Sequence, residues 1–358
     1  MTNLTLSFTL YQENDFKISV KMKESITIHD VGKKAQVSPS TVSRVINNTT
    51  RVSPKRRDQV LRAITELGYK TNIAARTLKT NKSLSIVCVV PEYSNPYFTE
   101  IYRGIQTEMN TNGYVTFLYE GTDAKNVINN MIMRGVDGVI FDAIYRKVMK
   151  TALTEAGIPF VQINTPAQYS GQNCIRIDIF NATLKIIDYL RLMGHTKIGL
   201  ITYKANNFPI REKFRAFKYY AETKNIANYR DCISEQEFSS VKATQGYAAM
   251  KDFINRGIDL TAIIALNDFV ALGAISAAIE YGLKVPHDIS IIGFDNSEVA
   301  QHSNPPLTTV NIPTFKQGEI AAQMLIELMN SERAEPYSVE LHTELIIRKS
   351  VKNLVAKQ

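Results

Sequence analysis

The most constraining feature of this sequence is the regular alternation of short apolar runs with longer stretches of helical periodicity from residue 84 onward. The runs are LSIVCVV (84–90), YVTFLY (114–119), GVIF (138–141), FVQI (160–163), KIGLI (197–201), AIIAL (262–266) and ISIIGF (289–294). Short apolar runs that alternate with helices predict the buried strands of a parallel α/β fold. In such sheets the loops after the strands form the ligand crevice, so residues just after the runs are candidate binding residues.

The length of the chain and the distribution of its charge predict a separate basic domain. A chain of 358 residues is expected to form two or three domains. Residues 22–82 carry thirteen Lys and Arg against four Asp and Glu, a net charge of +9, whereas the rest of the chain is close to neutral. A basic segment on a neutral body favours a nucleic-acid partner, because cationic side chains neutralise phosphates and release counterions. On charge alone, a solvated basic surface remains open.

Neither the cysteines nor the apolar runs indicate an exported or membrane protein. Cys88, Cys174 and Cys232 are scattered and lack C-x-x-C spacing, which predicts neither a disulfide framework nor a zinc site and fits a reducing cytoplasm. No apolar run approaches the roughly 20 residues needed to cross a bilayer. Residues 1–21 lack a basic leader and a continuous apolar core, so we expect a disordered extension, or a start codon assigned too early with Met22 as the true initiator.

Capping signals between residues 27 and 68 predict three short helices. Thr27 is expected to cap the first helix with Asp30 as its capping-box partner, and Ser38 followed by Pro39 begins the second, which runs to Ile46. The connection between these helices is only three residues long, the short turn of a helix-turn-helix, so the second helix is the expected reader of the major groove.

The third helix is expected to begin at Ser53 and Pro54 and to end at Gly68, a residue suited to the left-handed position after a helix. Its expected inward residues are Val60, Leu61, Ile64 and Leu67.

The exposed face of the second helix supplies the predicted DNA contacts. Arg44 can give a bidentate fork to guanine, and the hydroxyls of Thr41 and Ser43 suit phosphates or base edges. A small three-helix bundle with a surface arginine is the alternative. The full set of expected DNA contacts is Thr27, Ser38, Pro39, Ser40, Thr41, Ser43, Arg44, Asn47, Lys55, Asn72, Ala75, Arg76 and Leu78.

Residues 71–82 are expected to be a conditional hinge. Asn72 can cap a helix of about seven residues, which is too short to be stable alone and would fold against DNA and a second copy of itself. Leu78 can wedge between base steps in the minor groove, or serve as an ordinary hydrophobic anchor.

These motifs together resemble the LacI/GalR family of bacterial transcription regulators over residues 26–351. The family pattern appears in the head as TIHDVGKKAQVSPSTVSRVIN and in the hinge as YKTNIAARTL, with Gly32 in place of the usual Ala and Thr71 in place of the usual Pro. It continues in NPYF (95–98), GVDGVIF, GIPFVQIN, LMGHTKIGLI, LNDFVALGA, VPHDISIIGFDNSEVAQHSNPPLTTV and ELIIRKS.

The resemblance implies an α/β fold class, with an N-terminal three-helix helix-turn-helix head and a two-lobed, periplasmic-binding-protein-like, doubly wound core. We expect the DNA-binding domain in residues 22–70, the hinge in 71–82 and the core in 83–358. Within the core, the expected N-lobe comprises residues 83–194 and 312–341, and the expected C-lobe comprises residues 195–311 and 342–358. The resemblance also implies a homodimer that binds a pseudo-palindromic operator, and an effector clasped between the lobes.

The expected effector contacts are Tyr93, Phe98, Asn181, Arg211, Lys213, Asn267 and Asp295. Lys213 and Ala216 stand where the family has the Arg and Gly of R-x-x-G-F, and Arg211 is a candidate substitute for that Arg. Asp178 matches the acid of the family's V-D-N element, with Ile179 in place of the Asn. Capping roles for Asn267 and Asp295, and core packing for Tyr93 and Phe98, remain open.

No catalytic set, metal site or cofactor motif competes with this interpretation. The five histidines show no metal-ligand spacing, and the sequence has neither a glycine-rich phosphate loop nor a G-x-S-x-G elbow. We therefore expect a cytoplasmic regulator that is not an enzyme, controlled by a sugar or sugar phosphate, with a purine as the less favoured effector. A solute-binding protein without a DNA role is the alternative, and a protein corepressor remains open.

Overall fold

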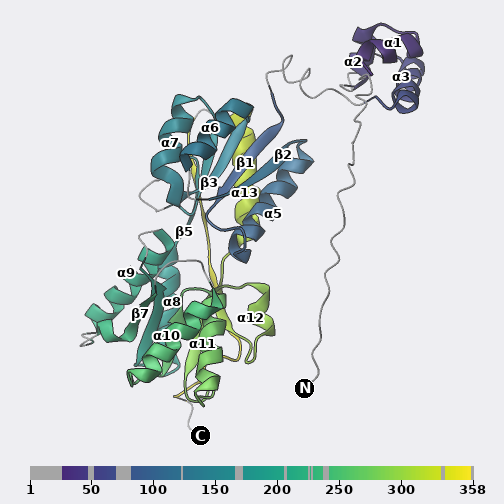
Figure 1. Ribbon diagram of the computed structural model, residues 1–358. Helices are drawn as coiled ribbons and strands as arrows, with labels where there is room; N and C mark the ends of the chain where they lie inside the picture. Colours follow the sequence, from purple (N-terminus) through teal and green to yellow (C-terminus); the bar gives the residue numbers. More distant parts are fainter. Residues whose placement is uncertain are drawn as a thin grey trace, which may run out of the picture. The chain divides into compact units, whose positions relative to one another are not determined.

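The computed structural model describes residues 26–46, 52–69, 82–121, 124–165, 172–204, 208–224, 226, 229–236, 242–331 and 335–355 (Figure 1). The chain divides into two compact units, residues 1–80 and residues 81–358, the head and the core. No helix in the described part of the chain is both long enough and apolar enough to span a membrane.

The described residues of the head form α1 (Ile28–Ala35), α2 (Pro39–Ile46) and α3 (Pro54–Leu67). The predicted capping box is confirmed: the Asp30 carboxylate accepts from the Thr27 backbone N–H at 2.8 Å, and the Asp30 N–H donates to the Thr27 hydroxyl at 3.4 Å. The Ser38 hydroxyl accepts from the Thr41 N–H at 3.3 Å, and Gly68, with φ of +62°, ends α3. The three helices therefore begin and end where the capping residues predict.

Two details of α3 differ from expectation. Leu61 is 48% exposed, because the helix packs on the other two through residues 60, 63, 64 and 67, and residue 61 is rotated by about 100° from that stripe. Ala63 is buried instead. Ser53 precedes the helix, but its side chain makes no capping hydrogen bond, so only the proline half of the predicted start signal is used.

The first lobe of the core is a six-stranded parallel sheet in the order β11-β5-β4-β3-β1-β2. Its elements are β1 (Ser85–Val90), α5 (Pro96–Thr111), β2 (Val115–Glu120), α6 (Ala124–Arg134), β3 (Gly138–Asp142), η1 (Ala143–Tyr145), α7 (Arg146–Glu155), β4 (Phe160–Ile163), β5 (Cys174–Ile177), α13 (Thr314–Met329) and β11 (Ser338–Leu341). Alternate residues of β1 serve opposite faces: Ile86 and Cys88 pack in the cluster with α5 and α13, whereas Val87 and Val89 pack with α6 and α7.

The second lobe is a six-stranded sheet in the order β12-β10-β9-β8-β6-β7, parallel except for the antiparallel edge strand β12. Its elements are α8 (Ile179–Leu192), β6 (Ile198–Tyr203), α9 (Phe208–Thr223), η3 (Tyr229–Cys232), β7 (Ile233–Gln236), α10 (Ala243–Asn255), β8 (Ala262–Ala265), α11 (Asp268–Glu280), β9 (Ser290–Asp295), α12 (Glu298–His302), β10 (Thr308–Asn311) and β12 (Glu344–Ile346). Helices α8 and α9 cover one face, and α10 and α11 cover the other (Figure 1).

The chain crosses between the lobes after β5, after β10 and after β11. The first crossing lies earlier than the sequence-based boundary at residue 194. Helix α8 packs against α9 and β12, and its residues Ile186 and Leu190 share a core cluster with Leu200 of β6. Residues 179–192 therefore belong to the second lobe, because the apolar face of α8 is buried on the second sheet.

Each lobe contains one pair of helices in close contact through glycines. A Cβ on Gly104 of α5 would overlap the carbonyl oxygen of Phe315 in α13, and a Cβ on Gly318 of α13 would overlap that of Ile101 in α5. The same reciprocal arrangement joins α10 and α11 through Gly246 and Gly273. The glycines let the two backbones approach closely, and any side chain would force the helices apart.

Candidate ligand cavity and nucleic-acid interface

The beginning of α2 in the head carries a compact group of hydroxyls. The Ser38 Oγ lies 2.8 Å from the Ser40 Oγ and 2.9 Å from the Thr41 Oγ1. Ser40 is exposed, Ser43 is partly exposed, and Arg44 is exposed in the last turn of the same helix. Hydroxyls and a cation on one short helix are suited to phosphate and base-edge contacts.

The remaining predicted DNA contacts fall into two groups. Pro39 is partly exposed at the start of α2, Lys55 is exposed in the first turn of α3, and Thr27 is exposed with its hydroxyl donating to Asp30 at 2.7 Å. Asn47, Asn72, Ala75, Arg76 and Leu78 lie outside the described residues. The DNA contacts of all these residues stay predictions.

The core contains a cavity of about 520 Å³ between the two lobes, at the carboxyl ends of the strands. Its volume is in the range typical of small-molecule sites. Five of the residues expected to contact an effector line it: Phe98, Arg211, Lys213, Asn267 and Asp295. The parallel topology brings these residues together, since strand ends that are far apart in sequence meet at one edge of a sheet.

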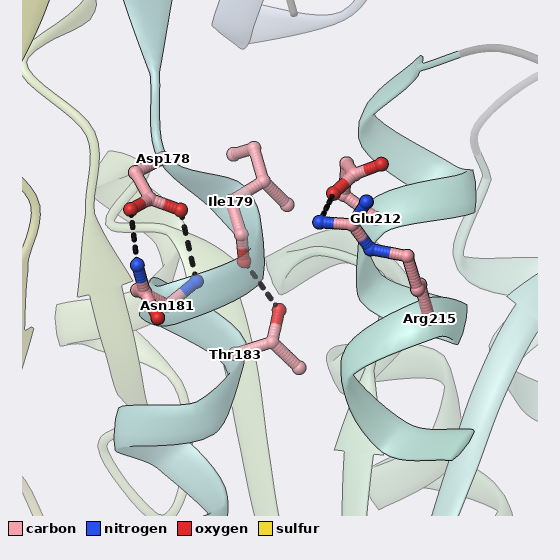
Figure 2. Close-up of polar contacts among 6 residues, drawn as sticks. All are labelled: Asp178, Ile179, Asn181, Thr183, Glu212 and Arg215. Carbon is pink, nitrogen blue, oxygen red and sulfur yellow. Dashed lines mark hydrogen bonds and ion pairs between the residues drawn. The ribbon is translucent and has the colours of Figure 1, made fainter. Parts of the chain in front are cut away.

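Two expected effector residues do not line the cavity. Tyr93 is 57% exposed, and its carbonyl oxygen accepts a hydrogen bond from Thr99. Asn181 is exposed at the start of α8, where its backbone N–H and its side-chain amide both donate to the Asp178 carboxylate (Figure 2). Asp178 is thus the N-cap of α8, and Asn181 completes that cap rather than reaching toward a ligand.

A polar network in the first lobe was missed from the sequence. The Tyr97 hydroxyl donates to the Asn164 Oδ1 at 2.6 Å, and the Gln317 Nε2 donates to the same oxygen at 2.9 Å. The Asn164 amide donates to the Asp142 carboxylate at 2.6 Å. Tyr97, Asp142 and Asn164 all line the cavity. Asp142 and Asn164 directly follow the runs GVIF and FVQI, so the strand-end rule could have found them, whereas no sequence signal marks Gln317.

Burial perturbs the titration of this network. Desolvation raises the pKa of Asp142 to about 6, although hydrogen bonds from the Ile144 N–H and the Asn164 amide oppose the shift. The pKa of Tyr97 is raised by burial first and then by the charges of Asp295 and Asp142. Asp295 belongs to the second lobe, so carboxylates of both lobes act on the same tyrosine.

The second lobe contributes a set of polar groups around the beginning of α11. The Asn267 side chain caps this helix by accepting from the Val270 N–H at 2.9 Å. The fully buried Asp268 accepts from the Ser297 N–H at 2.7 Å, the Ser297 hydroxyl at 2.8 Å and the Thr309 hydroxyl at 2.5 Å. The capping role left open for Asn267 is therefore confirmed, and the same residue lines the cavity.

Asp295 ends β9 with φ of +102°, and Asn296 follows with φ of +54°. Positive φ at two successive residues with side chains is a strained conformation that surrounding contacts must hold. Asp268 holds Ser297 on one side, and Arg348 donates to the Asn296 side chain at 2.7 Å on the other. The turn is thus fixed with Asp295 at the cavity wall.

Within the described residues, no group of three or more His, Cys, Asp or Glu side chains is placed to hold a metal ion. The cavity combines carboxylates and amides with apolar walls such as Ile144, Phe208 and Ile210. This combination provides hydrogen-bond partners for a polar small molecule that also has apolar faces.

Comparison with known proteins identifies relatives along nearly the whole chain. The model of the bacterial regulatory proteins of the lacI family matches residues 27–72, and that of the periplasmic binding protein-like domain matches residues 187–351. The transcriptional repressor PurR of Pasteurella multocida is 34% identical over 91% of this chain and 99% of its own length. The repressor CytR of Escherichia coli is 31% identical over 93% and 98%, and the regulator CelR of Thermobifida fusca is 30% identical over 90% and 98%.

Solved structures give the same relationship. The lac repressor dimer bound to operator and the anti-inducer ONPF matches with a TM-score of 0.81 and 26% identity, over 92% of this chain and 100% of the lac repressor chain. A complex of the transcriptional regulator CelR with cellobiose matches with a TM-score of 0.67 and 28% identity, over 91% and 99%.

Proposed function

Since this chain belongs to the lacI family of bacterial regulatory proteins, we propose that it is a repressor whose operator affinity is set by a carbohydrate in the cavity between its lobes. The observation that carries the proposal is the presence, in one chain, of a capped helix-turn-helix head and a polar cavity of about 520 Å³ in a two-lobed core. A solute-binding protein would need the cavity but would have no use for the head.

The head supports the DNA-binding part of the proposal through charge and geometry. The excess positive charge of the chain lies in residues 22–82, and the exposed side chains of α2 include Ser40 and Arg44. Sequence discrimination would come from α2 in the major groove, and lysines such as Lys55 would bind the backbone of either strand. The lac repressor, a similar protein, has been solved as a dimer bound to operator. The place of action would be the cytoplasm, where the operator is.

The cavity supports a sugar or sugar phosphate as effector. Carboxylates and amides from both lobes, including Asp142, Asn164, Asn267 and Asp295, are acceptors and donors that suit several hydroxyl groups at once. A ligand that contacts both lobes would bind best to one relative lobe orientation, and this difference in affinity is what couples it to the head. The similar regulator CelR has been solved as a complex with cellobiose. The proposal does not require a protein corepressor.

Exposed apolar side chains on the core support a homodimer. Val115 and Phe117 are 57% and 55% exposed on the edge strand β2, and Ile279 and Tyr281 are exposed at the end of α11. Exposed large apolar residues on both lobes mark candidate association surfaces. Two heads held by such a dimer would read the two halves of a pseudo-palindromic operator.

The proposal is tested by selecting fragments of the source genome on the immobilised full-length protein and sequencing what is retained. A shared pseudo-palindrome and preferential gel shifts over random DNA are the expected results. A thermal-shift screen of neutral sugars, sugar phosphates and nucleobases then identifies the effector, because a ligand selective for the folded state raises its stability. Retained fragments with no common motif, or an affinity equal to that for random DNA, would contradict the proposal.

A further inference from the structure

The ammonium group of Lys213 is held by the protein on the inner side of α9. The side chain is only 4% exposed, and its Nζ donates to the carbonyl oxygen of Leu266 at 2.5 Å. The same Nζ lies 3.6 Å from the centre of the Phe294 ring, a cation–π contact at close range. A carbonyl oxygen and an aromatic face thus take up contacts that a free ammonium would offer to a ligand.

Two carboxylates of the second lobe act on this cation. Burial lowers the pKa of Lys213, and the charges of Asp295 and Asp268 oppose that shift. Burial raises the pKa of Asp295, and the charge of Lys213 opposes it in turn. Tyr97 of α5 also interacts with the Asp295 charge. The neighbouring Glu212 instead pairs with Arg215 at 2.6 Å on the same helix (Figure 2).

The carboxylates differ in what else they contact. Asp268 is fully buried and is committed to Ser297 and Thr309. For Asp295, the described part of the chain provides no side-chain hydrogen bond, although its side chain lines the cavity. Asp268 is a buried carboxylate, which needs a nearby opposite charge or hydrogen-bond donors, whereas Asp295 is only partly buried. Among the described residues Lys213 forms no direct ion pair with either, so its charge acts on both at longer range from its place between Leu266 and Phe294.

We infer that Lys213, held between the Leu266 carbonyl and the Phe294 ring, is a positioning residue whose charge balances the carboxylates of Asp295 and Asp268, and that it does not bind an anionic group of the effector. This inference rests on the proposed function in taking the cavity as the effector site. Asp295 then presents acceptor oxygens to the cavity beside Asn267, so the inner end of the cavity takes the hydroxyl donors of an uncharged carbohydrate. A phosphate at that end would meet the Asp295 carboxylate, and the ammonium of Lys213 would already be engaged by the protein.

The resemblance alone would assign Lys213 the opposite role, because the family's arginine at this position commonly grips the effector. A guanidinium offers a planar fork of five donors, whereas an ammonium is a compact point charge with three. With one donor on Leu266 and the charge facing Phe294, Lys213 cannot reproduce the fork. The substitution therefore changes the function of the position from ligand contact to charge balance.

The inference is tested on the ligand-free full-length protein with a double-mutant cycle. Thermal unfolding is measured for the wild type, Lys213→Met, Asp295→Asn and the variant carrying both changes. We expect each single change to lower Tm and the double variant to regain more than half of the Tm lost in Lys213→Met, because the unbalanced carboxylate is gone. Lys213→Arg, which keeps the charge, should lie closer to the wild type than Lys213→Met does.

A pH series separates charge balance from simple packing. Without Lys213 the pKa of Asp295 should rise further, so the folded state of Lys213→Met binds the Asp295 proton more tightly than its unfolded state does. The Tm of Lys213→Met should therefore fall relative to that of the double variant as pH rises from about 5 to about 8. When Lys213 is present, the Tm difference between the wild type and Asp295→Asn should change less with pH. Equal effects of Asp295→Asn in both backgrounds, or a Lys213→Met variant as stable as the wild type, would overturn the inference.

Inorganic phosphate provides the last comparison. If Lys213 were an anion-binding residue, phosphate would raise the Tm of the wild type and not that of Lys213→Met. We expect the same phosphate effect on both proteins, and a shift confined to the wild type would overturn the inference. These measurements use neither operator nor sugar. A result that overturns the inference is therefore distinguishable from a failure of the proposed function, which the fragment selection and the sugar screen test.

Discussion

The side-chain amide of Asn164 donates a hydrogen bond of 2.6 Å to the carboxylate of Asp142, and so ties together the ends of two neighbouring strands at the wall of the cavity. Asp142 ends β3, and Asn164 directly follows β4 with φ of +56°. Asp142 also accepts from the Ile144 N–H at 2.9 Å. This carboxylate is therefore fixed in place but keeps a raised pKa because it is buried.

Asp142 should make the stability of the core depend on pH. Its pKa rises from 3.8 to about 6 on folding, so the folded state holds the proton more tightly, and the contribution of Asp142 to stability falls as pH rises from about 4 to about 6. The full change corresponds to about 3 kcal/mol. The unfolding free energy of the wild type minus that of Asp142→Asn should therefore decrease as pH rises from about 4 to about 6. Urea unfolding of both proteins at several pH values measures this decrease. A difference that is independent of pH would contradict the assignment.

Asn267 should have separable roles in stability and in ligand binding. Asn267→Ala removes the cap of α11 and should cost about 1 kcal/mol of unfolding free energy. Asn267→Asp retains an oxygen for the Val270 N–H and should keep most of that stability, but it loses the amide donor of a residue that lines the cavity. We expect both variants to lose the Tm increase given by the sugar found in the screen. A full sugar response in Asn267→Asp would exclude the amide as a contact.

Arg44 and Lys55 should affect DNA binding in different ways. Arg44→Ala should cost about 1 to 3 kcal/mol on the operator and little on random DNA, because a fork to a base edge is lost. Lys55→Ala should weaken both complexes alike and lower the salt dependence, because a phosphate contact is lost. Gel shifts at two salt concentrations measure both effects. Equal losses on operator and random DNA for Arg44→Ala would remove it from the reading surface.

Phe117 should matter for association rather than for folding. A charge at this exposed position of β2 should weaken the proposed dimer about tenfold or more, because the association surface proposed there is apolar. Sedimentation of Phe117→Glu should therefore show a shift toward monomer at low concentration. Met133→Glu, at a position that is 77% exposed on α6, is the matched control. Equal behaviour of the two variants would exclude the β2 surface from the interface.

Gly104→Ala should destabilise the first lobe by about 1 to 3 kcal/mol, because its Cβ overlaps the Phe315 carbonyl and forces α5 and α13 apart. Thr107→Ala, on the exposed side of the same helix, should change the unfolding free energy by no more than about 0.5 kcal/mol. Urea unfolding compares the two. A Gly104→Ala variant as stable as Thr107→Ala would show that the helices can separate at little cost.

Local patterns in the sequence predicted the elements, and tertiary contacts decided what the sequence left open. Caps such as Thr27 with Asp30 and stop signals such as Gly68 are local chemistry, so they located the head helices correctly. The prediction that Leu61 is buried was wrong, because nothing in the sequence distinguishes an apolar residue beside the buried stripe of α3 from one within it. The boundary near residue 194 was wrong because nothing in the sequence of α8 tells which of two sheets will bury its apolar face.

The residues that line the cavity were predicted only in part, because local patterns mark strand ends but not contacts from elsewhere in the chain. Asn267 and Asp295 follow apolar runs, and the strand-end rule places them correctly. Asn181 lies three residues after Asp178, the residue that matches the acid of the family's V-D-N element, but its side-chain amide donates to the Asp178 cap. Gln317 contributes to the polar network from the middle of a helix, which no pattern in the chain distinguishes from core packing.

The central claim, that occupancy of the cavity sets operator affinity, is tested most directly by linked binding measurements. Fluorescence anisotropy gives the operator Kd with and without the sugar that raises Tm, and calorimetry gives the sugar Kd with and without operator. The two Kd values should change by the same factor, typically about 5- to 150-fold, because coupling between two sites is reciprocal. An operator Kd that does not change at saturating sugar would contradict the account.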